Sequence, residues 1–565
     1  MKLILKQYLS SLKERDELDA ILPDLLSQLG LNVFSRPGRG TRQYGVDVGA
    51  VGSLDGGQEK VYLFSIKQGD LTRIDWDGNS LQSLRQSLNQ IVDAYISNYL
   101  PAEYHDKDVV ICICIGGDVQ EQVRLELESY IKQHSNNRIT FSQWNGDELA
   151  TRIQSCFLRE ELLPVNARSR LRKSLALLDE PEASFQHFAA LVKSLSVFDD
   201  QKDTSRVTAL RQISICLWIL FSWARDANNM EAAYLSSELT LLHAWKIGVP
   251  FFEAKGKIAE AISTSIASIF SVYSQICNEY LVINVLPHTS KLHALSSAVR
   301  ASCSLDVNLK LFDLLGRLAI GGIWAYWGAS HSTANEDLDA KKQLLQESSM
   351  YSESLKQLIN SNPVLLLPVK DEQAIDIFTA VFLLSFERSN HDYLKKWLAE
   401  IVTRSAFALQ TNGRYPCNLD SYSDLLSHPK SGDTEYLKNV TKGSILFPVI
   451  ALWAALLDDE EMYKQVALLK EKHLNHCGFQ VWFPDEISEE HFYTNSDTHG
   501  AALPVCVEKS REEFLAPIFS ECDQSQHFKK MSAIKYNWWP LLIVACRHYR
   551  LPLPPNLLEG LRNKS

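Results

Sequence analysis

The stretch VYLFSIKQGD, residues 61–70, decides how the N-terminal part of this chain folds. Its apolar residues are typical of a buried β-strand, and Lys67 places an ammonium group inside that strand. Burying a charge without a partner is costly, so we expect a compensating group nearby. The strand predicted over YGVDVGAVG, residues 44–52, carries Asp47 among its apolar residues. These two strands therefore bring opposite charges into one sheet.

Residues 1–160 alternate helical and strand patterns, which predicts a mixed sheet flanked by helices, an α/β domain. The 107–117 strand is apolar throughout, as a central parallel strand would be, and Asp-Gly-Gly before residue 61 indicates a hairpin. The predicted elements are a helix ending at Gly30, strands over 31–37, 44–52 and 61–68, a helix over 80–100, a strand over 107–117, a helix over 120–135 and a strand over 137–144.

After about residue 165 the pattern becomes helical, with apolar residues at helical spacing and few strand signals. We expect a large all-α domain over residues 165–565 with a sensor or interaction role. Its loop-rich residues 410–440 mark a place where it could divide further.

Composition narrows the class of protein. The net charge of −11 over 565 residues excludes a surface that coats nucleic acid generally, so any such contact requires a local basic patch. Eleven cysteines without a CxxC pair are typical of reduced thiols in a cytoplasmic protein. The longest apolar stretches, 318–329 and 446–457, are shorter than the roughly 18 residues of a membrane-spanning helix. We therefore expect a soluble, cytoplasmic protein without membrane contact.

Asp47 and the pair Ile66-Lys67 follow a predicted first helix and precede another helix. This arrangement, over about residues 10–150, resembles the PD-(D/E)xK nuclease superfamily and, within it, the Mrr-like, restriction-endonuclease-like domains. The resemblance implies hydrolysis of DNA phosphodiester bonds with Mg²⁺ or Mn²⁺. It makes Asp47 a metal ligand and Lys67 the group that stabilises developing negative charge. The family's first helix often supplies another acid, here Glu17, with Asp16 and Asp19 beside it.

Ser65 departs from the family pattern, which has Glu, Asp or Gln at this position. A hydroxyl is a poorer Mg²⁺ ligand than a carboxylate. The ligand set would then be Asp47, Glu17, Ser65 and the carbonyl of Ile66. Three interpretations stay open: an active nuclease, a nuclease fold that binds DNA without cutting it, and a structural ion pair between Asp47 and Lys67.

Basic residues surround this motif. Arg36, Arg39 and Arg42 lie in the glycine-bearing segment SRPGRGTRQYG, residues 35–45. Glycines let a backbone approach a ligand, and arginines bind phosphates with two donors, so we expect these three to contact DNA. Arg73 and Arg85 are further candidates for the same contact. A solvated loop, an exposed turn and a polar helix face are the alternatives.

A second group of candidate metal ligands has less specific spacing, matching no familiar zinc pattern. Core or surface histidines are the favoured explanation, and some other polar site is a further alternative. Its members are His473, His476, Cys477, His491, His499 and Cys506.

The sequence as a whole predicts a metal-dependent DNA endonuclease with a helical regulatory or partner-binding domain. By analogy with similar fusions, it resembles an effector of bacterial anti-phage or restriction systems, acting with a partner protein or by self-association. The alternative is a degenerate nuclease fold that serves as a DNA- or protein-binding scaffold. RNA is a weaker substrate candidate, because no aromatic stacking motif is recognised in the sequence.

Overall fold

The computed structural model divides the chain into two compact units, Met1–Ser236 with Gly256–Ser265, and Ser237–Lys255 with Ile266–Ser565. The boundary predicted at 160–165 and the subdivision near 410–440 stay predictions. The described residues are Lys6, Leu9, Ser10, Leu12, Glu14 and the ranges 18–36, 43–54, 56–78, 83–156, 165–197, 203–299, 301–331, 338–430 and 434–562.

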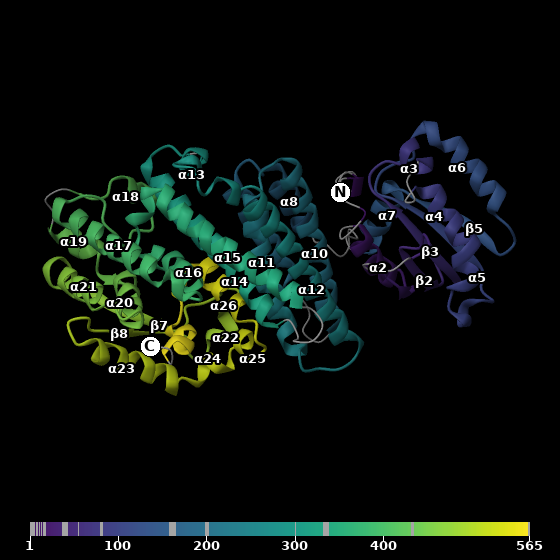
Figure 1. Ribbon diagram of the computed structural model, residues 1–565. Coiled ribbons are helices and arrows are strands. Elements are labelled where there is room, and N and C mark those ends of the chain that lie inside the picture. The colour runs from purple at the N-terminus through teal and green to yellow at the C-terminus, as the bar shows by residue number, and fades with distance from the viewer. Residues whose placement is uncertain are drawn as a thin grey trace. The chain divides into compact units, whose positions relative to one another are not determined.

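A five-stranded mixed sheet forms the centre of the N-terminal part, as predicted (Figure 1). Its spatial order is β1-β2-β3-β4-β5; the first three strands are antiparallel, and β4 is parallel to β3 and β5. Every residue of β4 is buried, which confirms the predicted central parallel strand. The bounds are β1 (Asn32–Ser35), β2 (Val48–Gly52), β3 (Lys60–Lys67), β4 (Val109–Ile115) and β5 (Ile139–Trp144).

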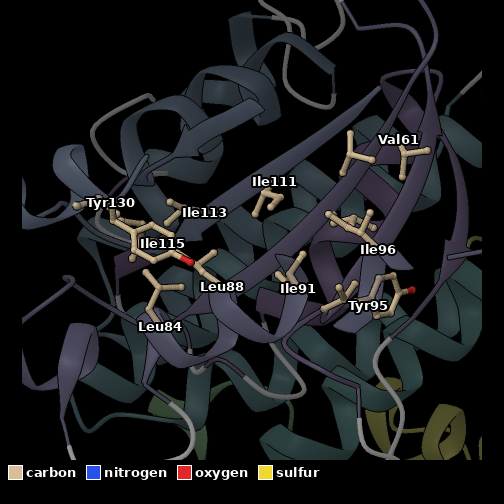
Figure 2. Packing of buried hydrophobic residues seen from close by; sticks show 14 of the residues in the cluster. Val61, Leu84, Leu88, Ile91, Tyr95, Ile96, Ile111, Ile113, Ile115 and Tyr130 are labelled. Atoms are coloured by element: carbon tan, nitrogen blue, oxygen red, sulfur yellow. The ribbon is translucent and has the colours of Figure 1, made fainter. Parts of the chain in front are cut away.

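Helices cover both faces of this sheet. Side chains of α3, α4, η2, α5 and α6 pack on one face against Val61, Ile111 and Ile113 (Figure 2), whereas α2 contacts β1, β2 and α7. The helix predicted over 80–100 is interrupted by the π-helix η2. The bounds are α2 (Asp19–Gln28), α3 (Arg73–Asp77), α4 (Leu84–Gln90), η2 (Ile91–Tyr95), α5 (Ile96–Asn98), α6 (Glu121–His134) and α7 (Gly146–Cys156).

The rest of the chain is mainly helical, as predicted, and its helices are joined by short 3-10 turns. They are α8 (Val165–Ala176), α9 (Pro181–Leu195), α10 (Asp203–Asp226), α11 (Glu231–Gly248), α12 (Lys257–Cys277), the π-helix η5 (Asn278–Ile283), α13 (Ala294–Ala298), α14 (Ser304–His331), α15 (Leu338–Ser361), α16 (Ala374–Leu384), α17 (His391–Thr411), α18 (Tyr422–Leu426), α19 (Thr434–Val440), α20 (Leu446–Leu456), α21 (Glu460–His473), α22 (Ser488–His491), α23 (Arg511–Gln524), α24 (Gln526–Lys530), α25 (Ser532–Lys535), α26 (Trp539–Tyr549) and α27 (Glu559–Arg562).

A small sheet departs from the purely helical prediction for residues 165–565. It has the order β6-β7-β8, with β6 (Gly443–Ser444), β7 (Gly478–Phe483) and β8 (Ala501–Pro504). β6 has only two residues and pairs with β7, so it leaves no alternating pattern in the sequence. β7 does alternate between exposed and more buried positions, as a half-buried strand does.

A buried network of charges joins three helices of the second unit. The Arg547 guanidinium donates to both carboxylate oxygens of Glu238 at 2.6 Å and to Asp313 at 2.7 Å. Arg317 pairs with the other oxygen of Asp313 at 2.5 Å, and His548 lies 3.1 Å from Glu238. Burial raises the pKa of Glu238, but Arg547 and His548 outweigh it and lower this pKa to about 2. Here each buried acid has a basic partner, which favours the ionised state.

The same network extends to α16. Arg550 donates to Asp376 at 2.9 Å, and Asp376 is 1% exposed. Gly316 of α14 makes room for this carboxylate, because an added Cβ would lie 2.3 Å from an Asp376 oxygen. Three acids and three arginines therefore meet within the helical unit, and burial raises the pKa of Asp376 despite its contact with Arg550.

Two of the described helices are long and apolar enough to cross a membrane: Ser205–Asp226 and Lys257–His288. Core helices meet the same criterion. The apolar window of the first is 78% buried. The exposed face of the second carries hydroxyl groups at Ser263, Thr264 and Ser271, which is typical of a surface helix of a folded domain. The apolar window of the second helix is 39% buried, and a soluble, cytoplasmic protein stays a prediction.

Candidate active site

Asp47 lies immediately before β2 rather than inside it, because the strand begins at Val48. Its N–H donates to the Phe64 carbonyl at 2.8 Å, although Val48 is already the register partner of Phe64. Two residues thus face one, as in a β-bulge, a device that redirects a side chain. The Asp47 carboxylate accepts a hydrogen bond from the Ile66 N–H at 2.7 Å. The bulge therefore places this carboxylate beside the end of β3.

Lys67 is the last residue of β3, and its ammonium group lies 3.2 Å from a carboxylate oxygen of Glu14. The Lys67 side chain is 12% exposed and that of Glu14 is 30% exposed, so solvent reaches this pair. Lys67 and Asp47 themselves form no ion pair within 4 Å, as both are described and neither is recorded as the other's partner. The structural Asp47–Lys67 pair, one of the three interpretations above, is therefore absent from these described residues.

The carboxyl of Asp47 has a pKa raised to about 6, from an ordinary value of 3.8. Loss of hydration is the main cause; the Ile66 hydrogen bond and the Lys67 charge act in the opposite direction. The acids Glu14 and Asp19 raise this pKa further. Three acids and one lysine thus share the place where β2 begins and β3 ends, and a bound cation would relieve their mutual repulsion.

Ser65, the residue that departs from the family pattern, is 1% exposed. Its hydroxyl has no hydrogen-bond partner among the described residues. Ser65 shares one face of β3 with Val61 and Leu63, which pack in the core. Its register partner Ile113 belongs to the same core. The role of Ser65 as a metal ligand stays a prediction. Its neighbour Ile66 has its N–H occupied by Asp47, and its carbonyl stays a predicted ligand.

Glu14 takes part in the site where the sequence interpretation placed Glu17. Glu17 and Asp16 lie outside the described residues, so their predicted roles stay predictions. Acids lie close together in the sequence at positions 14, 16, 17 and 19, and no local pattern shows which of them approaches Lys67.

The predicted DNA-binding arginines are placed only in part. Arg36 is exposed just after β1, and its carbonyl accepts a hydrogen bond from the Gln43 side chain at 3.2 Å. Arg73 is exposed at the start of α3. Arg85 pairs with Asp77 at 2.6 Å on the surface. The other two, Arg39 and Arg42, lie outside the described residues. Contact with DNA stays a prediction for all five.

No group of three or more His, Cys, Asp or Glu side chains that could hold a metal ion is found within the described part of the chain. Mg²⁺ commonly uses one or two carboxylates, several waters and substrate phosphates. Asp47 and Glu14 supply hard oxygen atoms of that kind. A magnesium or manganese ion bound by these residues stays a prediction.

The histidine- and cysteine-rich stretch of the second unit is engaged in internal contacts. His476 lies 2.8 Å from the Thr441 hydroxyl, and His499 lies 3.2 Å from the Ser488 hydroxyl. These contacts are those of packed side chains.

Comparison of this chain with protein-family models, with curated proteins and with solved structures gives no match. The resemblance to PD-(D/E)xK nucleases therefore rests on the motif itself and stays a prediction.

Proposed function

We propose that this protein is a metal-dependent DNA endonuclease with a restriction-endonuclease-like N-terminal domain. The observation that carries the proposal is the convergence of Asp47, Glu14 and Lys67 where β2 begins and β3 ends. A partly buried carboxylate with a raised pKa, other acids and one lysine are the parts that metal-assisted phosphoryl chemistry uses.

Asp47 and Glu14 would hold the ion, with the Ser65 hydroxyl and the Ile66 carbonyl as further oxygen donors. When bound, Mg²⁺ or Mn²⁺ neutralises charge on the phosphate and lowers the pKa of a coordinated water. The Ile66 N–H fixes one oxygen of Asp47, which orients the other oxygen. Because ionised Asp47 is needed to bind a cation, ligand binding must overcome its raised pKa.

Lys67 supplies the positive charge for the scissile phosphate. Without substrate its ammonium group is held by Glu14 at 3.2 Å, so Glu14 keeps it directed into the site. In the catalytic complex Lys67 would contact the scissile phosphate and stabilise the negative charge that develops there. Exposed Arg36, together with Arg39 and Arg42 of the same segment, would hold the DNA backbone.

The helical part would regulate the nuclease or bind a partner. By analogy with fusions of this kind, the protein would be a cytoplasmic effector of an anti-phage or restriction system, with a partner protein or self-association as the trigger.

Incubation with supercoiled plasmid in Mg²⁺, Mn²⁺ or EDTA tests the proposal. We expect the wild type to nick or linearise the plasmid only with metal, and Asp47→Asn and Lys67→Met to lose this activity. Asp371→Asn is the matched control: Asp371 is also buried with a pKa raised to about 6, but it lies in the helical unit. Equal nicking by all four proteins would refute the proposal.

A DNA- or protein-binding scaffold is the second candidate, favoured by Ser65 in place of an acidic ligand. It predicts DNA binding that neither EDTA nor Asp47→Asn alters, and no cleavage by any variant.

A further inference from the structure

A pair of stacked tyrosines lies three residues from Asp47. The rings of Tyr44 and Tyr99 are 4.3 Å apart at an angle of 27°, and their hydroxyl groups are hydrogen-bonded at 2.7 Å. Tyr99 is 51% exposed. Large aromatic side chains on a protein surface are common at binding sites, and here two of them are held parallel by each other.

The backbone holds this pair in a fixed position. Tyr44 has a φ of +48° and Gly45 a φ of +83°. A left-handed conformation costs energy in a residue with a bulky side chain, and such strain is concentrated at functional sites. An added Cβ at Gly45 would lie 2.1 Å from the Ser87 carbonyl oxygen, so the chain contacts α4 directly here. The Tyr44 ring is therefore placed by the turn rather than by a flexible loop.

A buried tyrosine supports this pair from the core. The ring centroids of Tyr95 and Tyr99 are 6.3 Å apart, and the Tyr95 hydroxyl is hydrogen-bonded to Ser35 at the end of β1. Tyr95 is 8% exposed, whereas Arg36, the residue after Ser35, is exposed. A predicted phosphate contact thus lies next to the residue that anchors Tyr95.

We propose that the Tyr44–Tyr99 pair is a stacking platform for an unpaired base of DNA, an inference that rests on the proposed nuclease function. A base within a duplex is covered on both faces by its neighbours, so only an unpaired base can offer its face to Tyr99. Aromatic stacking of this kind binds any base, and nearby arginines follow the backbone. The substrates would accordingly be DNA molecules with single-stranded segments, whose adjoining phosphate enters the Asp47–Lys67 site.

Fluorescence anisotropy with the full-length protein in EDTA tests this inference without cleavage. The probes are a labelled 20-nucleotide mixed-sequence single strand and a blunt-ended duplex of the same sequence, in which every base is paired. We expect tighter binding of the single strand and about a tenfold loss for Tyr99→Ala on that probe, against less than about twofold on the duplex. Tyr99→Phe keeps the ring and loses only the hydrogen bond to Tyr44, so it should bind within about twofold of the wild type.

A 2-aminopurine base in the single strand reports stacking directly, because its fluorescence is quenched by contact with an aromatic ring. We expect quenching by the wild type and by Tyr99→Phe, and none by Tyr99→Ala. Tyr422→Ala is the matched control, since Tyr422 is 45% exposed in the helical unit; it should behave as the wild type. Thermal unfolding checks that every variant is folded.

The inference is overturned if Tyr99→Ala binds the single strand as the wild type does, or loses duplex affinity equally. These outcomes are distinct from failure of the nuclease proposal. If stacking depends on Tyr99 but no metal-dependent cleavage is found, the nuclease proposal is refuted and the stacking inference stands. If cleavage depends on Asp47 but Tyr99→Ala binds the single strand normally, only the stacking inference is refuted.

Discussion

The two units each contain a cluster of shielded charges, and the clusters are built in opposite ways. In the helical unit, Arg547 lies between Glu238 and Asp313, and the pKa of Glu238 is lowered to about 2. Beside the sheet, burial raises the pKa of Asp47 to about 6, and the described charged groups around it are Glu14, Asp19 and Lys67. Among the described residues, Glu238 therefore has a base in direct contact, whereas Asp47 has none.

This difference separates a structural role from a binding role. A balanced buried network holds helices in register and gains nothing from an added ion. In a cluster with more acids than bases, repulsion between the carboxylates lowers the stability of the folded protein. A cation that binds there removes this repulsion, so cation binding stabilises the fold. Both clusters contain acids and basic groups, so residue type alone does not distinguish a structural cluster from a binding cluster. The number of basic groups in contact with each acid distinguishes them.

The largest effect is expected from Arg547→Met, which leaves the fully buried Glu238 with His548 as its only partner among the described residues. Asp313 is partly exposed and keeps Arg317. Breaking a buried ion pair by removing one member costs about 3–5 kcal/mol, so the free energy of unfolding should fall by that amount in urea titration. Lys67→Met is the matched substitution in the other cluster. Its pair with Glu14 is partly exposed, and we expect a loss below about 1 kcal/mol. Equal losses would remove the distinction between the clusters.

Asp47→Asn should lower metal-dependent cleavage by at least about a hundredfold, as loss of one essential electrostatic group does. Its stability should be unchanged or higher, because the amide oxygen still accepts from Ile66 while a destabilised charge is removed. Glu238→Gln should show the reverse, with normal cleavage per folded molecule and clear destabilisation. Plasmid assays measure cleavage and urea titrations measure the free energy of unfolding for both variants. A lower free energy of unfolding for Asp47→Asn than for the wild type would contradict the prediction.

The pH dependence of stability should differ in sign between the two acids. The folded pKa of Asp47, about 6, exceeds its ordinary value of 3.8, so its charge destabilises the fold above pH 6 and this penalty vanishes by about pH 4. The folded pKa of Glu238, about 2, is below 4.5, so its stabilisation is present above pH 4.5 and is lost towards pH 2.

Urea titrations of the metal-free protein across pH 3–8 test whether the contributions of Asp47 and Glu238 to stability change with pH in opposite directions. The stability difference between the wild type and Asp47→Asn should shrink as the pH falls from 7 to 4, whereas that between the wild type and Glu238→Gln should persist down to about pH 4.5. A difference for Asp47→Asn that grows in acid would show that the carboxylate is stabilised by the fold.

The smallest effect is expected from Ser65→Ala. The Ser65 hydroxyl has no hydrogen-bond partner among the described residues, so its removal should leave the stability of the metal-free protein unchanged or slightly raised. The concentration of Mg²⁺ needed for half-maximal cleavage should rise only a few-fold. A large loss of stability in urea titration would instead assign this hydroxyl a structural contact.

The sequence predicted the sheet well because its strands carry local signals. The continuous apolar run of β4 and the hairpin before β3 established strand number, order and the parallel centre. The β-bulge at Asp47 could not be predicted, because it depends on a hydrogen bond to Phe64 across the strand pair rather than on a local pattern. The two-residue strand β6 was missed for the same reason.

For the candidate site, strand periodicity was enough to propose Asp47 and Lys67 together. Glu14 was missed, because a run with acids at 14, 16, 17 and 19 does not show which one faces the sheet. The Tyr44–Tyr99 pair was also missed, since its members lie 55 residues apart and meet only through the left-handed turn at Tyr44 and Gly45.

Titration calorimetry of the metal-free protein with Mn²⁺ tests the central claim, that the acids beside Lys67 bind a divalent cation. The account predicts a binding isotherm for the wild type and for Asp371→Asn, whose buried acid is already satisfied by Ser444 and Ile445, and an affinity at least about tenfold weaker for Asp47→Asn. Identical isotherms for all three proteins, or no binding by any of them, would contradict it.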